Sequence, residues 1–274
     1  MESRNNLHIL DLPFDVLHII HEFSNPNINN LLKTCMQMWM YKEQLHELRL
    51  NNRASKLFCS DPAAREEIMS YLDKNARRLH LDLHLCEHID DASVLENVHS
   101  LDLYSSWNVS DAFHFRNAHS LDLTNCFLVS DVSLLGNVYN LVLSGCYRID
   151  DVSALGRVHT LDLSRCPRIT DVSALGGVHT LDLSYCPNFT DVSTLGRLHH
   201  LNLRCCNWGG LLAGIQKLGG LHTLDLRDCG IIKGVQVDIL SKVKMLQITN
   251  TIFIEDNTDP DTDTNAGSEL DSNQ

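Results

Sequence analysis

The chain repeats one pattern of hydrophobic and polar positions. Residues 158–177 read VHTLDLSRCPRITDVSALGG, and the next 20 residues share 15 of those 20 positions. Each copy has the spacing LxxLxLxxCxxI, with other apolar residues also used at its L and I positions. Its paired leucines recur at 81/83, 101/103, 121/123, 141/143, 161/163, 181/183 and 201/203, and looser pairs follow at 224/226 and 246/248. A period of this length is typical of a solenoid, in which each repeat gains a core only by stacking on its neighbours.

The alternation within each copy predicts its secondary structure. In LDLS, residues 161–164, apolar and polar side chains alternate, which predicts a short strand with its leucines pointing inward. Residues 170–177 remain for the return path, and they are too few for an α-helix with both its connections, so a turn or 3₁₀ segment is expected. The acid of each DVSxL stretch is expected to cap that turn. Where the chain turns back, a positive φ is expected at Gly136, Gly156, Gly176 and Gly196.

The repeat resembles the leucine-rich repeat family. This resemblance implies an α/β solenoid over residues 79–254, with a parallel β-sheet on one side and a convex side of short turns or 3₁₀ helix. In that family the inward ladder position behind each strand takes Asn or Cys, because small groups that meet a backbone partner suit it. Ser106 and Thr251 hold the position in two copies here. Structural free thiols are expected in the others, at Cys86, Cys126, Cys146, Cys166, Cys186, Cys206 and Cys229.

Residues 6–50 do not follow the repeat and are expected to be helical. Pro13 suits a first helical position, and an apolar stripe follows it over residues 16–23. Residues 25–27 break that helix, and a second stripe runs from Ile28 to Trp39. Helices this short need a partner surface, which is either the end of the solenoid or another protein.

The same residues resemble the F-box. The opening is LPxDV at residues 12–16, and later Leu, Cys and Trp residues follow at the family's spacing. The resemblance implies docking on a Skp-type adaptor through Leu12, Pro13, Val16, Leu17, Ile20, Leu32, Cys35 and Trp39. The alternative is an amphipathic cap that closes the first repeat. The near-identical 20-residue copies also resemble repeats in F-box and leucine-rich repeat proteins of giant DNA viruses.

The remaining segments are less regular. Residues 45–50, LHELRL, suit an irregular first repeat. Residues 51–78 are expected to hold a linker and a capping helix. This helix is expected to begin at Asp61-Pro62 and to cover the end of the sheet. Two longer return paths, 211–218 and 235–243, look more helical and suit an end that stops further stacking. Residues 255–274 are acidic and polar, and we expect them to be disordered.

Composition narrows the functional class. The net charge of −13 makes nucleic acid a poor partner. No run reaches the length of a membrane span, and the first 15 residues lack the basic start and apolar core of a secretory signal. We therefore expect no membrane partner. We also expect an intracellular protein, either cytoplasmic or nuclear, which would lie in a host cell if the protein is viral. Its ten cysteines are expected to stay reduced there.

Metal binding and catalysis are not expected. Zinc sites need ligands that converge on one point at spacings unlike a uniform ladder. Six histidines share one repeat position and every copy looks alike, so we expect an edge-of-strand histidine ladder, with no metal and no cofactor. Ser, His and Asp also recur only as repeat consensus, and hence no catalytic triad stands out and no enzyme is expected. The six are His99, His119, His159, His179, His199 and His222.

The outward strand positions predict a binding surface. Six copies have Asp between the leucines, and like charges in a parallel stack reduce stability, so this Asp column is either tolerated or used. Departures from the repeat lie beside it, at Tyr104, Asn140, Val142, Arg165, Tyr185, His200, Arg204 and Arg227. Tyr and Arg often anchor interfaces. We predict a protein target with a basic surface, contacted by Asp102, Tyr104, Asp122, Asp162, Arg165, Asp182, Tyr185, Arg204 and Arg227.

Two functional interpretations remain open. With the F-box resemblance, the repeats imply a substrate receptor of an SCF-type cullin-RING ubiquitin ligase, whose N-terminal helices dock the adaptor while the repeats hold the target. The alternative is a leucine-rich repeat interaction scaffold without a ligase role. A hydrolase, the third class considered, has no support in the sequence.

Overall fold

The computed structural model describes residues 47–71, 78–86, 89, 92–206, 212–233 and 237–254. The helical module expected over residues 6–50 lies outside the described residues up to residue 46, and its last four residues, Glu47–Leu50, form a strand and not a helix. The tail expected from residue 255 onward also lies outside the described residues. In the part of the chain that is described, no helix has the length and apolar character needed to cross a membrane.

Ten parallel strands form one sheet, in chain order except that β10 belongs to a second sheet. Leu161 lies opposite Leu141 on one side and Leu181 on the other, so the sheet stacks the paired leucines in register. The strand pairing confirms the predicted solenoid and includes residues 47–50 as its irregular first strand. The strands are β1 (Glu47–Leu50), β2 (Arg78–Asp82), β3 (Ser100–Asp102), β4 (Ser120–Asp122), β5 (Asn140–Val142), β6 (Thr160–Asp162), β7 (Thr180–Asp182), β8 (His200–Asn202), β9 (Thr223–Asp225) and β11 (Met245–Gln247).

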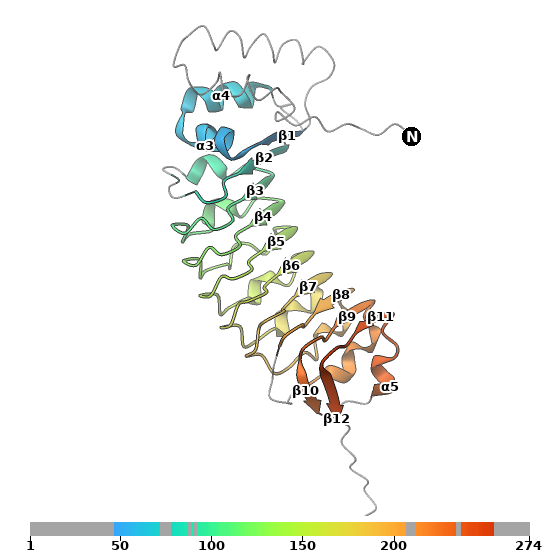
Figure 1. Ribbon diagram of the computed structural model, residues 1–274. Coiled ribbons are helices and arrows are strands. Elements are labelled where there is room, and N and C mark those ends of the chain that lie inside the picture. Colours follow the sequence, from blue (N-terminus) through green and yellow to red (C-terminus); the bar gives the residue numbers. More distant parts are fainter. Residues whose placement is uncertain are drawn as a thin grey trace, which may run out of the picture.

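The other side of the array consists of turns and short 3₁₀ segments, as expected from eight-residue return paths. Figure 1 shows the strands following one side of a bent array and these segments following the opposite side. Val172, Leu175 and Val178 from the turn side meet Leu161 and Leu163 from the strand side, and all five are buried. The core is therefore one continuous apolar layer between the two sides. The 3₁₀ segments are η2 (Ala92–Leu95), η3 (Phe113–Phe115), η4 (Ser153–Leu155), η5 (Ser173–Gly177), η6 (Leu195–Arg197) and η7 (Ile215–Gly220).

The expected positive φ at the turn-back glycines is wrong. Gly156 has an ordinary φ of −64°. A Cβ at Gly156 would lie 2.2 Å from the carbonyl oxygen of Ala174 in the next copy, and one at Gly136 would lie 2.3 Å from that of Ala154. Glycine stands at these positions because successive turns pack closely, and not because of its conformational freedom.

Positive φ occurs instead at the residue before each ladder position. The φ there lies between 53° and 73°, and glycine holds the site only at 145 and in no other copy. The backbone N–H of Arg165, one of these residues, donates to the carbonyl oxygen of Ser184 in the next repeat at 2.9 Å. The left-handed turn thus continues the inter-repeat hydrogen bonds beyond the strand. The residues are Leu85, Ser105, Asn125, Gly145, Arg165, Tyr185, Cys205, Asp228 and Asn250.

Two helices cover the N-terminal end of the sheet. The helix expected at Asp61-Pro62 is α4 (Pro62–Tyr71), and the Asp61 carboxylate accepts the N–H of Ala63 at 2.9 Å. The preceding helix α3 (Asn52–Ser60) was not expected, and it is α3 that packs on the sheet end, because Phe58 is only 2% exposed. The Ser55 hydroxyl links it to the strands by donating to Leu50 and accepting the N–H of Asp82. Figure 1 shows α4 outside α3, which corrects the expectation that α4 meets the sheet itself.

The C-terminal end adds a second, two-stranded parallel sheet that the repeat pattern did not predict. It pairs β10 (Gly230–Lys233) with β12 (Thr251–Ile254). The expected helical return paths are the 3₁₀ segment η7 and the short helix α5 (Val237–Leu240). Figure 1 places these elements together at the end of the array.

Candidate functional site

The cysteine ladder is a structural feature of the core. The Sγ of Cys166 donates to the carbonyl oxygen of Leu143 at 3.2 Å, and equivalent bonds of 3.0 to 3.2 Å recur in five other copies. Burial raises the pKa of the Cys126 thiol to about 12. The cysteines of the described residues form no disulfide, and Cys35 lies outside them. The ladder cysteines thus take the inward, backbone-bonded position expected of them, and burial disfavours the reactive thiolate form at Cys126.

Each acid of the Asp column caps the end of its strand. An oxygen of Asp162 accepts the backbone N–H of Ser164 at 2.8 Å, two residues on. Five other members do the same for the residue two places on. Asn202 makes this bond with the N–H of Arg204 at 3.0 Å. In these copies the position supplies an oxygen acceptor for the backbone, a structural role that was not predicted for the Asp column, but the cap does not need a charge.

The charged form is disfavoured at two members of the Asp column. Burial raises the pKa of Asp162, and the charges of Asp182 and Asp122 raise it further, against the lowering effect of the Ser164 hydroxyl and N–H. The pKa of Asp102 is raised by burial and by its neighbours Asp122 and Asp82. A raised carboxyl pKa means that ionisation is less favourable there than in water. At Asp102 and Asp162 the strand face thus carries negative charges that reduce its stability.

Two of the predicted contact residues form a pair beside the Asp column. The guanidinium carbon of Arg165 lies 5.4 Å from the centre of the Tyr185 ring, which is a cation–π distance. Both residues occupy the left-handed positions, and the Tyr185 side chain is 44% exposed. Tyr104, also exposed, directly follows the second leucine of the β3 repeat. These three remain available on the same edge of the sheet.

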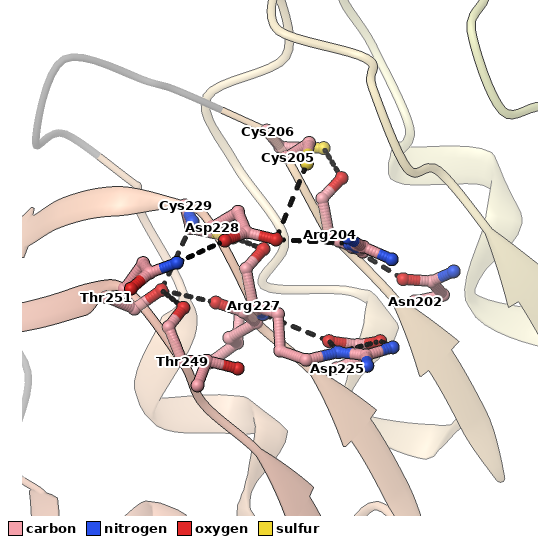
Figure 2. A network of polar contacts seen from close by, with 12 residues as sticks. Asn202, Arg204, Cys205, Cys206, Asp225, Arg227, Asp228, Cys229, Thr249 and Thr251 are labelled. Atoms are coloured by element: carbon pink, nitrogen blue, oxygen red, sulfur yellow. Dashed lines mark hydrogen bonds and ion pairs between the residues drawn. The ribbon is translucent and has the colours of Figure 1, made fainter.

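Arg204 and Arg227 have partners within their own chain. Arg204 Nε donates to Asp228 at 3.2 Å, and Arg227 Nη2 donates to Asp225 at 2.6 Å (Figure 2). Asp228 also accepts from Asn250 at 2.8 Å, and these donors hold its pKa below the usual value. The contact of these two arginines with a target stays a prediction. In the structure they balance acids at the C-terminal end of the face, so its middle is the more acidic part.

The histidine column is a continuous stack of rings. Consecutive ring centres lie 4.4 to 4.8 Å apart, and the ring planes differ by 23° or less. Three of these histidines also have Nδ1 within 3.2 to 3.3 Å of the hydroxyl of the threonine that follows them. This agrees with an edge-of-strand ladder, and a tyrosine continues it where one copy lacks histidine. The stacked rings are His99, His119, Tyr139, His159, His179, His199 and His222.

One copy of the ladder differs from the rest. His200 takes the place that Thr180 and Thr223 hold beside it in the sheet. Its ring approaches His199 with centres 4.5 Å apart, and one ligand nitrogen from each of His199, His200 and His222 lies within 4.8 Å of the other two. Burial, and then the neighbouring histidines, lower the pKa of His199 and of His200. The expectation of no metal assumed that all copies are alike, and that assumption fails here.

The residues predicted to bind an adaptor cannot be placed. Leu12, Pro13, Val16, Leu17, Ile20, Leu32, Cys35 and Trp39 all lie outside the described residues. Their assignment stays a prediction from the sequence.

The solved structures similar to this chain include internalins of low sequence identity. No protein-family model and no curated protein matches the chain. An internalin, InlF, from Listeria monocytogenes is 21% identical with a TM-score of 0.49, and the match covers 68% of this chain and 57% of that one, less than two thirds of its length. Internalin C2 of the same organism is 21% identical, with a TM-score of 0.36 and coverage of 59% and 75%. The functional domain of its InlJ, which includes a cysteine ladder, is 17% identical, with a TM-score of 0.22 and coverage of 63% and 57%. The ten-stranded parallel sheet described above, with one strand in each repeat, is itself the fold of a leucine-rich repeat solenoid.

Proposed function

We propose that this chain is a leucine-rich repeat interaction scaffold without catalytic activity, and that the strand face binds a protein with a basic surface. Repeat solenoids offer such extended faces to large partners. The observation that carries the proposal is the charge of the Asp column. An amide caps the strand end equally well, as Asn202 does, yet most copies carry a carboxylate whose ionisation is disfavoured at Asp162. A charge that the cap does not need and that reduces stability is explained by a positively charged partner.

The test compares two pairs of acids that make the same backbone bond on opposite sides of the array. Asp162→Asn with Asp182→Asn removes two charges from the strand face, and Asp151→Asn with Asp171→Asn removes two from the turn side. All four acids accept an N–H two residues on, and Asn can keep that bond. Partners retained by the full-length chain at low salt are identified by mass spectrometry, purified and titrated one by one. We expect the strand-face pair to weaken binding several-fold and the turn-side pair to leave it unchanged.

Salt dependence gives a second readout. Exposed charges interact over about 8–10 Å at physiological salt, which spans about two repeats, so neighbouring carboxylates act together. Binding should therefore weaken as salt rises, mainly through the association rate. Indifference to salt and to the strand-face pair would contradict the proposal. It would direct attention to a hollow of about 630 Å³ on the turn side, where Arg197 and Lys217 lie among small residues.

A second candidate function is that of a substrate receptor of an SCF-type ubiquitin ligase. It is supported by the F-box-like residues 12–39 of the sequence. The test is co-purification of a Skp-type adaptor with the full-length chain, compared with Leu12→Ala plus Pro13→Ala. The double variant should lose the adaptor and keep the circular dichroism spectrum of the repeats. If the unaltered chain retains no adaptor, the ligase role fails, whereas the scaffold proposal stands.

An intracellular location is part of the proposal. It is supported by the cysteines of the described residues, which form no disulfide, since disulfides form and persist in oxidising compartments and are rare in the cytosol and nucleus. Fluorescence microscopy of the tagged chain would test it, and secretion into the medium would contradict it.

A further inference from the structure

Three imidazoles meet at one point on the strand side of the array. His199 precedes β8, His200 is its first residue, and His222 precedes β9. The ring centres of His199 and His222 lie 4.5 Å apart and those of His200 and His222 lie 5.5 Å apart. Backbone bonds hold the segments in place, because the carbonyl oxygen of His199 accepts the N–H groups of His222 and Thr223 at 3.0 and 3.1 Å.

We propose that His199, His200 and His222 form a binding site for a divalent transition-metal ion of the zinc, nickel or copper class. In the described residues, this is the one group of three or more potential ligands that converges in this way. The proposal does not depend on the identity of the protein partner.

The distances suit a site that tightens when it is loaded. Imidazole nitrogens bind Zn²⁺ at about 2.0–2.1 Å, which places two tetrahedral ligands about 3.3 Å apart. The three nitrogens lie within 4.8 Å of one another, so the rings must approach by up to about 1.5 Å. His199 is exposed and the other two rings are half-buried, and side-chain rotation can provide this shift without moving the strands.

The nature of the ligands selects the ion. Neutral imidazole suits Zn²⁺, Cu²⁺ and Ni²⁺, whereas Ca²⁺ and Mg²⁺ require oxygen ligands. The Nδ1 of His222 lies 3.2 Å from the hydroxyl of Thr223. A ring that donates this N–H has its lone pair on Nε2, which is how second ligand shells commonly orient a metal-binding histidine. Three protein ligands leave a fourth coordination position for water or for a side chain of a partner.

The neighbouring copies show what is special about this one. His179 is followed by Thr180, and the two side chains lie 3.2 Å apart. His199 is followed by His200, so a second imidazole replaces the hydroxyl of the usual pair. A histidine ladder alone gives a row of nearly parallel rings. At this copy His200 adds a third imidazole beside the rings of His199 and His222.

The experiment uses metal-free full-length protein titrated with Zn²⁺, Ni²⁺ and, as a spectroscopic probe, Co²⁺. The test variant is His200→Thr, because threonine occupies both neighbouring positions and the fold is expected to accept it. Loss of a ligand should weaken binding at least as much as loss of an outer-shell partner, which is about 10–100-fold. His119→Asn is the matched control, since it removes a ladder ring far from the group, and it should bind like the unaltered chain.

A transplant makes the test sharper. Thr180→His, introduced into the His200→Thr variant, places three histidines one repeat earlier in the same arrangement, and it should restore metal affinity. Weak, equal binding by the unaltered chain and His200→Thr, with comparable thermal melting, would overturn the proposal. Equal tight binding would overturn it too, because the metal would then lie on other residues.

Discussion

The middle of the sheet and its C-terminal end use polar side chains in different ways. Between β4 and β7 many of the repeated polar residues bond to backbone or to the next residue, as Asp162 does with Ser164 and His159 with Thr160, and the side-chain pair Arg168–Asp150 is well exposed. From β8 onward the period opens, and arginines bond to acids that are largely or partly buried, as Arg227 does with Asp225 and Arg204 with Asp228. Residues that recur because the backbone needs them say little about function. Residues that break the pattern carry the more specific chemistry. In the middle region, the charge of the Asp column is a feature that the backbone does not require.

The largest expected effect comes from a side chain added between two turns of the middle region. Gly156→Ala places a Cβ 2.2 Å from the carbonyl oxygen of Ala174, and backbone atoms cannot move away cheaply. Overpacking of this kind costs about 1–3 kcal/mol, or more where the backbone must shift. We expect a corresponding fall in the free energy of unfolding, measured by urea denaturation.

Gly145→Asn is the matched control. Its φ is +73°, but Asn125 holds the same position of its own repeat with a φ of 58°. The nearest atom to the new Cβ would be the side-chain oxygen of Asn125, which can rotate away. We expect a smaller loss than for Gly156→Ala. The opposite order would mean that conformational freedom, and not close packing, accounts for the glycines.

The cysteine ladder should have the same structural role in both regions, and replacing one of its cysteines by serine should cost little stability. Cys166→Ser keeps a donor near Leu143, but with a shorter side chain, and should cost about 1–2 kcal/mol through an imperfectly satisfied hydroxyl. Ser106 and Thr251 already occupy this position, and each donates to the carbonyl oxygen of a preceding leucine. Urea denaturation measures the loss. Complete unfolding on this one change would contradict the shared role of the ladder.

Removing one arginine from an ion pair should affect stability differently in the two regions. Arg227 bonds to Asp225, a carboxylate only 7% exposed, and Arg227→Ala leaves that charge without its partner in a buried site. In the middle region Arg168 and Asp150 form a pair in which both side chains are more than half exposed, and such pairs contribute little. We expect a clear fall in the urea midpoint for Arg227→Ala and none for Arg168→Ala. Equal effects would remove the distinction between the regions.

The repeat made much of this fold predictable. Each position has the same environment in every copy, so Cys166 and Leu161 could be assigned by comparing copies, and the stacking register followed. The helix α3 could not be predicted this way, because its buried residues Ser55 and Phe58 are too few to form an apolar stripe. The second sheet was missed because β10 and β12 lie beyond the regular period.

The candidate sites were less predictable, because they depend on contacts between copies. Sequence comparison marked His200 as a departure, but its meeting with His222 follows from the pairing of β8 with β9 across the longer repeat. Asp228, the partner of Arg204, also lies in the next copy across this longer repeat, whereas Arg227 bonds to Asp225 in its own copy. The capping role of the Asp column could have been found, since Asn202 shows at that position which group the backbone requires.

The smallest expected effect is on the free energy of unfolding when an Asp is replaced by Asn. Its sign should be opposite on the strand side and on the turn side of the array. Asp162 has a raised pKa, so its charged form is disfavoured in the folded state. Asp162→Asn should therefore raise the free energy of unfolding at pH 7 by about 0.2–1 kcal/mol. This gain should disappear as pH falls through the raised pKa, because both chains are then neutral at that position. Asp171 on the turn side has its pKa lowered by hydrogen bonds from Ser173, so Asp171→Asn should reduce stability at pH 7, and the difference should vanish only as pH falls through the lowered pKa. Urea denaturation of both variants from pH 7 to pH 3 measures the two signs. If both variants lose stability, the charge at Asp162 favours the fold, and its presence needs no basic partner.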